Sequence, residues 1–237
     1  MIEMKPFSET EMSVMLENFN EYMIIGGMPA IVNSFVTTKN YSGTLKMQKQ
    51  ILLDYEEDIT KYAAGLDQGK ILNIYRKIPV FLGNDNKKFQ ISKVARNARN
   101  RDYVGTVDWL SNAGIVNICY CMDMPCLPLK GNYNPDNYKL YFRDTGLLIG
   151  SLDEEVQDDL RANKNFNTYK GALYENIVAD MLVKSGYDLY FFRNEKSTIE
   201  MDFFVRDRNS LIPVEVKAKD SSTPSLNKLI DSDKYPD

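Results

Sequence analysis

The chain has 237 residues, of which 43% are hydrophobic, and a formal net charge of -4 with an isoelectric point near 5.1. This length and apolar content exclude a disordered tail and predict a soluble globular chain of one large or two smaller domains. The sequence contains no histidine, which excludes Ser-His-Asp and Cys-His catalysis, HExxH zinc sites and histidine phosphotransfer. Acid, base or metal chemistry must therefore come from carboxylates, lysines, arginines or the three cysteines.

The cysteines and the apolar runs indicate the cellular setting. Cys119, Cys121 and Cys126 are odd in number, and no N-terminal run has the order of a signal peptide. We expect reduced cysteines in a cytoplasmic protein, since three cysteines without histidine are too few for a structural zinc site within one chain. No apolar run approaches the ~20 residues of a membrane helix, so no membrane partner is expected.

Residues 1–66 have the pattern of an acidic, mostly helical linker segment, which we take as the first domain. Gly26-Gly27-Met28-Pro29 separates a helix near residues 9–24 from a further helical stretch, because paired glycines and a proline cannot continue a helix. Apolar residues at near-helical spacing predict a long helix over residues 41–63.

Residues 67–152 have shorter predicted elements, helices followed by strands, and form the second predicted domain. Apolar periodicity and capping residues predict three helices, at residues 70–82, 92–98 and 102–112. Strand-like runs follow at residues 115–121, 126–130 and 138–142. Three helices followed by a hairpin predict a winged helix-turn-helix-like unit.

An acidic connector, residues 153–159, marks a boundary before the third predicted domain, residues 160–237. A helix is expected from Thr168 to a stop at Gly186, and a short one near the end at residues 224–232. Between them, strands are expected at residues 187–193, 199–206 and 211–218. Residues 207–210 have the composition of a hairpin turn, which predicts that the second and third of these strands are antiparallel neighbours.

Charged side chains gather on one face of these two strands. Alternation places Glu200 and Asp202 together on the first strand and Glu215 with Lys217 on the second. In-register pairing brings Asp202 close to Glu215, and like charges at close range need a cation. We therefore predict a Mg²⁺ or Mn²⁺ site at Asp202 and Glu215, with Lys217 orienting or deprotonating the attacking water, or stabilising transition-state charge.

Glu175, on the preceding helix, is the candidate for a third carboxylate. Gly171 lies four residues earlier on the same face, where a small residue is expected to let the helix pack closely. The alternative remains open that Glu175 and Asp202 are ordinary surface acids, and that Glu215 and Lys217 belong to a solvated strand face.

Four runs in this order resemble a known family: Gly171-Ala-Leu-Tyr-Glu175, Tyr190-Phe-Phe-Arg193, Glu200-Met-Asp202-Phe and Ile212-Pro-Val-Glu215-Val-Lys217. They resemble the PD-(D/E)XK (restriction-endonuclease-like) domain that closes a large family of bacterial and archaeal AAA-type ATPases. Residues 26–29, 58–59, 110–115 and 141–147 also resemble the C-terminal region of that family. The resemblance covers nearly the whole chain.

The resemblance implies an α+β architecture: a helical N-terminal segment, a winged helix-like unit and a PD-(D/E)XK α/β domain. In that fold the positions matching Asp202 and Glu215 hold the metal, the one matching Lys217 assists the water, and the one matching Glu175 supports them. The implied reaction is Mg²⁺-dependent phosphodiester hydrolysis, with DNA and the ATPase domain of the same parent protein as partners.

The alternative implied by the same resemblance is a non-catalytic DNA- or protein-interaction module on a degenerate nuclease scaffold. Met201 stands where the name of the motif has proline, a change that this fold tolerates. Only 19 residues follow Ala218, so the strand that usually continues the nuclease core is expected to be absent from a trimmed chain.

The chain carries no recognisable ATP site. Walker A requires GxxxxGK[ST], and the nearest approach, Gly65-Leu-Asp-Gln-Gly69-Lys70-Ile71, has the wrong spacing and no hydroxyl residue after Lys70. We predict that ATP binding belongs to the ATPase domain of the parent protein.

A basic segment, residues 87–101, contains cations and no acid. Its charged residues are Lys87, Lys88, Lys93, Arg96, Arg99 and Arg101. A phosphate backbone would be attracted to this segment, and the attraction would fall with salt. The alternative is a solvated face on a packing or partner-binding unit.

Overall fold

The computed structural model describes residues 6–84, 86–162, 164, 167–196, 198–218 and 222–232. It shows a mixed α+β protein with a helical N-terminal region followed by an α/β region. The chain forms two compact units: unit 1 is Met1–Leu52 with Asp144–Asn165, and unit 2 is Leu53–Arg143 with Phe166–Asp237. The three consecutive domains expected from the sequence stay a prediction, since these units follow contacts and not chain order.

Unit 1 is helical. Its elements are α1 (Glu9–Ile25), α2 (Pro29–Thr38), the first part of α3 (Tyr41–Tyr62), α6 (Thr145–Gly150) and α7 (Val156–Arg161). A capping box starts α1, because the Ser8 hydroxyl accepts from the Glu11 amide while the Glu11 carboxylate accepts from the Ser8 amide. The helices expected at residues 9–24 and 41–63 are thereby confirmed.

The break between α1 and α2 is confirmed, and unit 1 shows its cause. Gly26 has φ 75°, a left-handed conformation that a side chain disfavours. The next amide, Gly27 N–H, donates to Asp144 Oδ2 at 2.6 Å, and Asp144 Oδ1 accepts from the Leu147 amide at the start of α6. One buried carboxylate therefore ties the glycine turn to a second helix.

Unit 2 combines helices with two sheets. Its helical elements are the rest of α3, α4 (Gln68–Leu82), the short 3-10 turns η1 (Ile91–Lys93) and η2 (Asn100–Tyr103), α5 (Thr106–Asn112), α8 (Asn167–Lys184) and α9 (Pro224–Ile230). Its strands are β1 (Val116–Met122), β2 (Tyr133–Phe142), β3 (Leu189–Arg193), β4 (Glu200–Met201), β5 (Phe203–Asp207) and β6 (Ser210–Val214). The larger sheet has the order β2-β1-β3-β4, and β5 with β6 forms the smaller one.

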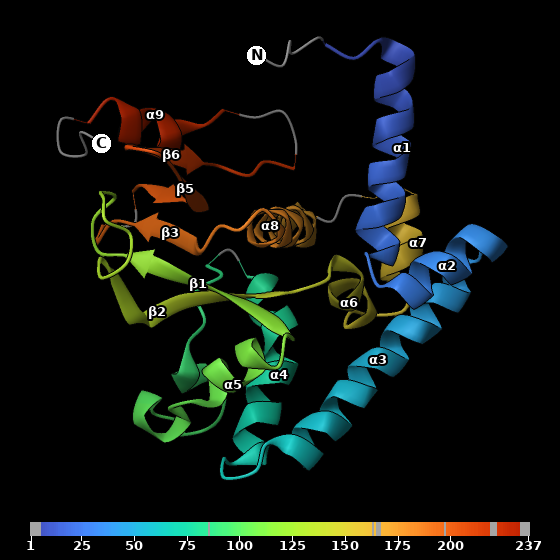
Figure 1. Cartoon of the computed structure of the whole chain (residues 1–237), viewed down its shortest axis with the longest axis horizontal. Coiled ribbons are helices and arrows are strands. Elements are labelled where there is room, and N and C mark those ends of the chain that lie inside the picture. Colours follow the sequence, from blue (N-terminus) through green and yellow to red (C-terminus); the bar gives the residue numbers. More distant parts are fainter. Residues whose placement is uncertain are drawn as a thin grey trace. The chain divides into compact units, whose positions relative to one another are not determined.

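Helices cover both faces of the larger sheet (Figure 1), with α8 on one side and α4 and α5 on the other. Alternation along β2 explains this arrangement. Tyr141 points to α8, where its hydroxyl meets Glu175, whereas Phe142 packs edge-to-face on Tyr75 of α4. Because both faces are covered, Lys139 in β2 is buried, and a buried charge needs partners.

The prediction that a strand at residues 126–130 forms a hairpin with β1 was wrong. β1 pairs antiparallel with β2 from Tyr133 onward, and residues 126–130 form no strand. Pro125 and Pro128 have no N–H for a ladder, and the Asn132 amide group donates to the carbonyls of Met124 and Cys126, which holds this stretch as a loop. The other edge of β1 pairs in parallel with β3.

Two helix predictions also need correction. The helix expected over residues 92–98 is only the 3-10 turn η1, and Asn97 has φ 63°, which an α-helix does not allow. The helix expected from residue 102 begins at Thr106, because Gly105 has φ 77°.

The strand expected over residues 199–206 is divided at Asp202. Residues before it, β4, pair with β3, and residues after it, β5, pair with β6. The predicted antiparallel hairpin is confirmed, with Phe203 opposite Val214 and Asp207 opposite Ser210. β6 ends at Val214, so Glu215 and Lys217 follow the strand and do not lie within it.

Among the described residues, no helix combines the length and the apolar character that crossing a bilayer requires.

Candidate functional site

The carboxylate–lysine cluster of unit 2 is built from the four residues predicted as catalytic and their charged partners. Glu175 and Asp202 both lie near Lys139, and the Glu215–Lys217 pair joins them through the intervening Val216 amide, which donates to Asp202. It also contains four charged residues that were not predicted as catalytic. Glu200 was expected on the same strand face as Asp202 and Lys87 in the basic segment, whereas Lys139 and Arg193 were not predicted in the site as charged groups.

Lys139, in the middle of β2, is the centre of the cluster. Its side chain is only 2% exposed, and Nζ lies 3.1 Å from Glu200 Oε1, 3.8 Å from Asp202 Oδ1 and 3.9 Å from Glu175 Oε2. Burial lowers the pKa of Lys139, but the three carboxylates together raise it above its ordinary value. Lys139 is therefore a charged ammonium group inside the protein.

Glu175 is held by α8 against the sheet. β2 is an edge strand, so the backbone of Phe142 is free to exchange two hydrogen bonds with the side-chain amide of Asn176, the residue after Glu175. Glu175 Oε1 forms an ion pair with Lys87 Nζ at 2.8 Å, and Glu175 Oε2 accepts a hydrogen bond from the Tyr141 hydroxyl at 3.1 Å. Gly171 does not explain this placement, because no described atom lies within 4 Å of a Cβ built there.

Asp202 lies at the junction between β4 and β5. Its Oδ2 accepts from the Val216 amide at 2.9 Å, which brings the residues after β6 to the cluster. Burial, and then the charge of Glu175, raise the pKa of Asp202 to about 6 in spite of Lys139 and Lys87. A proton on Asp202 is therefore gained or lost near neutral pH.

Glu215 and Lys217 form an ion pair of their own. Lys217 Nζ lies 2.6 Å from Glu215 Oε1, and the Glu215 side chain is only 6% exposed. Its second oxygen, Oε2, is buried and has no hydrogen-bond partner among the described residues. An added cation or hydrogen-bond donor could serve that oxygen.

The cluster balances its own charges. Four carboxylates, Glu175, Glu200, Asp202 and Glu215, face four cations, Lys87, Lys139, Arg193 and Lys217. The pairs of Glu175 with Lys87 and Lys139 are largely buried on both sides, and such pairs are costly to break, because removing one partner leaves an uncompensated charge.

These residues fit a magnesium ion poorly. Within the described part of the chain, no three His, Cys, Asp or Glu side chains are grouped so that they could hold a metal ion. Lys139 lies between Glu175 and Asp202, so an added cation near both carboxylates would meet an ammonium group. Asp202 and Glu215 alone remain available as ligands.

A signal for Lys139 was present in the sequence. Tyr138-Lys139-Leu140-Tyr141-Phe142 is a strand in which one lysine interrupts an apolar run. A strand with both faces buried reads as a nearly continuous apolar run, so a single charge within it indicates a buried ion partner.

The cations of the basic segment differ in their exposure to solvent. Lys87 points inward, with a side chain only 13% exposed and bound to Glu175. Lys93, Arg96 and Arg99 are exposed, and Arg101 is exposed beside Asp102 at 3.7 Å. Lys88 is half-buried. The segment thus presents fewer cations to solvent than its sequence contains.

Comparison with known protein families gives two matches. Residues 16–158 match a domain of unknown function, DUF8612, and residues 170–236 match a second domain of unknown function, DUF4143. Since the first match spans more than half of the chain, the chain belongs to the DUF8612 family. DUF4143 is found at the C-terminus of AAA-ATPase-associated proteins, in agreement with that part of the resemblance. No curated protein and no solved structure matches the chain.

Proposed function

We propose that this chain is a non-catalytic nucleic-acid-binding module of an AAA-ATPase-associated protein. One observation carries the proposal: Lys139, an ammonium group supplied by the chain itself, lies among three carboxylates of the site in which a nuclease would bind a metal. The cluster is neutral as it stands, with a cation for each carboxylate.

The order of the elements supports a scaffold derived from a winged helix-like part and a degenerate PD-(D/E)XK part. α4 and α5 precede the β1–β2 pair in the first part, and α8 precedes β3 to β6 in the second. Asp202 and Glu215 lie on either side of the β5–β6 hairpin, as a nuclease-derived scaffold would require. What departs from a nuclease is the added lysines.

Nucleic-acid binding is supported by the exposed part of the basic segment. Lys93, Arg96 and Arg99 form no ion pair with any described residue, so their charges are not offset by contacts within the described chain. Cations in this state release counterions from a phosphate backbone when they bind it. DNA is the partner that we assign to this surface.

The metal question is tested by calorimetric titration of the purified chain with Mn²⁺, with Asp202→Ala as the matched variant. We expect no saturable binding by either protein. In parallel, single-stranded, double-stranded and branched DNA are incubated with the chain and Mg²⁺ or Mn²⁺, and no cleavage is expected. Binding that Asp202→Ala abolishes, together with cleavage that Asp202→Asn abolishes, would overturn the non-catalytic assignment.

Nucleic-acid binding is tested by fluorescence anisotropy with labelled single-stranded and duplex DNA at several salt concentrations. Affinities typical of non-specific binding, with a Kd of about 10⁻⁴ to 10⁻⁶ M at physiological salt, are expected. The double variant Arg96→Glu/Arg99→Glu should bind far more weakly. Absence of binding by the unmodified chain would remove DNA from the proposal.

A second candidate is Mg²⁺-dependent phosphodiester hydrolysis, and one observation favours it. Glu215 Oε2 is buried without a hydrogen-bond partner among the described residues, as expected of a ligand whose cation is absent. Asp202 and Glu215 would hold the ion, which would supply charge stabilisation at the phosphate, and Lys217 would lie beside it. The metal titration above distinguishes the two candidates.

A further inference from the structure

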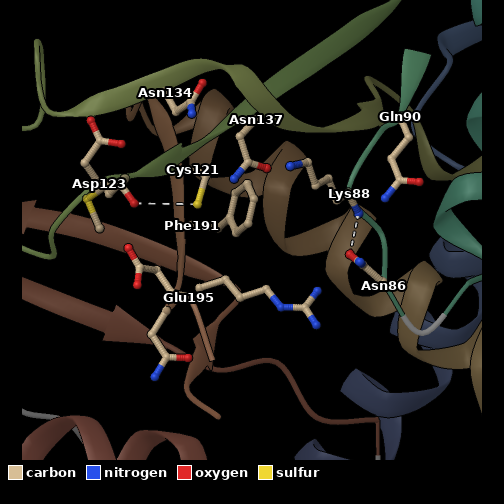
Figure 2. A pocket seen from close by; sticks show the side chains of 12 residues that line it. Asn86, Lys88, Gln90, Cys121, Asp123, Asn134, Asn137, Phe191 and Glu195 are labelled. Carbon is tan, nitrogen blue, oxygen red and sulfur yellow. Dashed lines mark hydrogen bonds between the residues drawn. The ribbon is translucent and has the colours of Figure 1, made fainter. Parts of the chain in front are cut away.

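A polar pocket of about 550 Å³ lies in unit 2 (Figure 2). Arg193 lines the pocket and also pairs with Glu200 of the carboxylate–lysine cluster. The pocket is formed by the loop after α4, the ends of β1 and β3, and the start of β2. β1 and β3 are parallel neighbours, and the carboxyl ends of neighbouring parallel strands are a common place for ligands in α/β proteins.

The lining is unusually rich in side-chain amides. Five carboxamides line the pocket, from Asn86, Gln90, Asn134, Asn137 and Asn194. Local hydrogen bonds hold several of them in place: Asn86 Oδ1 accepts from the Lys88 amide at 3.2 Å, and Asn194 Oδ1 accepts from the Thr198 amide at 2.8 Å. The pocket is therefore preorganised by its own loops.

Two buried polar atoms in this lining lack a hydrogen-bond partner among the described residues. They are Asn137 Oδ1 and Arg193 Nε, although Arg193 Nε also lies 3.5 Å from Glu200 Oε2. Buried polar atoms are nearly always satisfied in folded proteins, so each unmet one needs an explanation. Both belong to side chains that line the pocket, so the polar lining is not fully satisfied by the described part of the chain.

The charges of the lining restrict the chemistry of a ligand that the pocket could hold. Lys88 and Arg193 can receive an anionic group, while Asp123 and Glu195, both exposed, accept hydrogen bonds. A simple anion would be repelled by the two acids. A ligand with a phosphate at one end and hydrogen-bond donors elsewhere matches both charges, and carboxamides match the donor and acceptor edges of nucleobases.

We propose that this pocket holds one nucleotide of a bound single strand, with its phosphate at Lys88 and Arg193 and its base among the carboxamides. This inference rests on the proposed nucleic-acid-binding function and assigns a specific subsite to it. The Arg193–Glu200 and Glu200–Lys139 ion pairs connect this subsite to the carboxylate–lysine cluster.

The test compares variants of the full chain by anisotropy with a labelled single strand of about 12 nucleotides. Lys88→Ala and Asn137→Asp should each weaken binding roughly fivefold or more, the size of one lost bidentate contact. Lys130→Ala removes a cation outside the pocket, whose side chain is 82% exposed, and should change binding less than about twofold. Thermal melting of each variant shows whether the fold is retained.

A second arm measures nucleoside 5′-monophosphates and inorganic phosphate by calorimetry. The nucleotides should bind, Lys88→Ala should weaken that binding, and inorganic phosphate alone should bind at least about tenfold more weakly, since it lacks the base contacts. Equal binding of phosphate and nucleotide would overturn the base subsite. Binding of an acidic peptide in preference to nucleotides would assign the pocket to a protein partner and also overturn it.

The outcomes separate the two proposals. If the single strand binds normally and neither pocket variant weakens it, the subsite is wrong and the nucleic-acid-binding function stands. If no DNA binds, that function is wrong, and the mononucleotide titration then decides the pocket: binding lost in Lys88→Ala keeps a nucleotide site, whereas no binding removes it.

Discussion

The two units bury polar groups in different ways. Unit 1 uses hydrogen bonds between mostly neutral groups: Gln48 Nε2 donates to the carbonyls of Ile24 and Ile25 at 2.8 and 3.1 Å, and Gln157 Nε2 donates to Gln48 Oε1 at 3.1 Å. Unit 2 instead buries full charges around Lys139.

The buried polar groups of the two units therefore differ in what they satisfy. The polar groups of unit 1 satisfy backbone atoms where helices end, as Asp144 does for Gly27 and Leu147. The charges of unit 2 satisfy one another and leave Glu215 Oε2 unmet. Charge burial is expensive, so the buried charges of unit 2, unlike the neutral hydrogen bonds of unit 1, single out this part of the chain as the candidate site.

The largest expected effect is loss of the central cation of unit 2. Lys139→Met should lower the free energy of unfolding by about 3–5 kcal/mol, because Glu175, Glu200 and Asp202 would be buried without their ammonium partner. Urea denaturation measures the change. Lys130→Met removes an exposed pair with Asp188 and should cost less than about 1 kcal/mol. Equal stability of the two variants would show that Lys139 does not balance the cluster.

The next effect concerns the glycine turn of unit 1. Gly26→Ala should cost about 2–4 kcal/mol, since its φ is 75° and an added Cβ would overlap Asp144 Oδ1 and the Gly146 amide. Gly65→Ala is the control: its φ is 83°, but no described atom lies within 4 Å of the added Cβ, so only the backbone cost of about 1 kcal/mol is expected. Chemical denaturation of both variants tests the difference, and equal losses would contradict a packing role for Gly26.

A smaller effect is the pH dependence from Asp202. Its pKa is about 6 in the folded protein and near 3.9 when unfolded, so the folded state holds the proton more tightly. The stability from this proton is fully present below the unfolded value and is lost as pH rises through about 6. Between about pH 4 and 8, the chain should lose about 2 kcal/mol relative to Asp202→Asn.

The measurement for Asp202 is denaturation of both proteins across that pH range. Asp188→Asn, at an exposed carboxylate, provides the baseline for the method. A stability difference between the chain and Asp202→Asn that does not change with pH would mean that Asp202 titrates normally.

The smallest effect on stability, and the most specific to binding, is expected in the basic segment. Arg99→Ala should change the free energy of unfolding by less than about 0.5 kcal/mol, since Arg99 is exposed. It should reduce the slope of log K against log salt for DNA by about 1, the value for one lost phosphate contact. An unchanged slope would place the phosphate contacts elsewhere, and Lys130→Ala serves as the control cation.

Local signals made much of the fold predictable. The break at Gly26–Pro29, the long helix over residues 41–63 and the hairpin around residues 207–210 were each predicted from a turn or a period, and each is confirmed. The strand predicted at residues 126–130 was wrong, because Pro128 within it cannot donate to a ladder and the Asn132 side chain holds the stretch as a loop.

The candidate site was predictable only in part. Glu175, Asp202, Glu215 and Lys217 were found as a set from spacing and resemblance. Lys139 and Glu200 were missed as a pair, although their ammonium and carboxylate groups lie 3.1 Å apart, because that contact joins two strands far apart in the chain. Local periodicity carries no information about such a pair.

The sequence by itself determined the chemistry available and the local elements: no histidine, an acid-free basic segment, the capped helices and the hairpin. Only the tertiary structure decided how the charges are paired. The parallel pairing of β1 with β3 and the packing of α8 on β2 bring Lys139 to Glu175, Glu200 and Asp202. Burial then makes each charge depend on its neighbours, because a charge removed from water is stable only beside an opposite charge or a hydrogen bond.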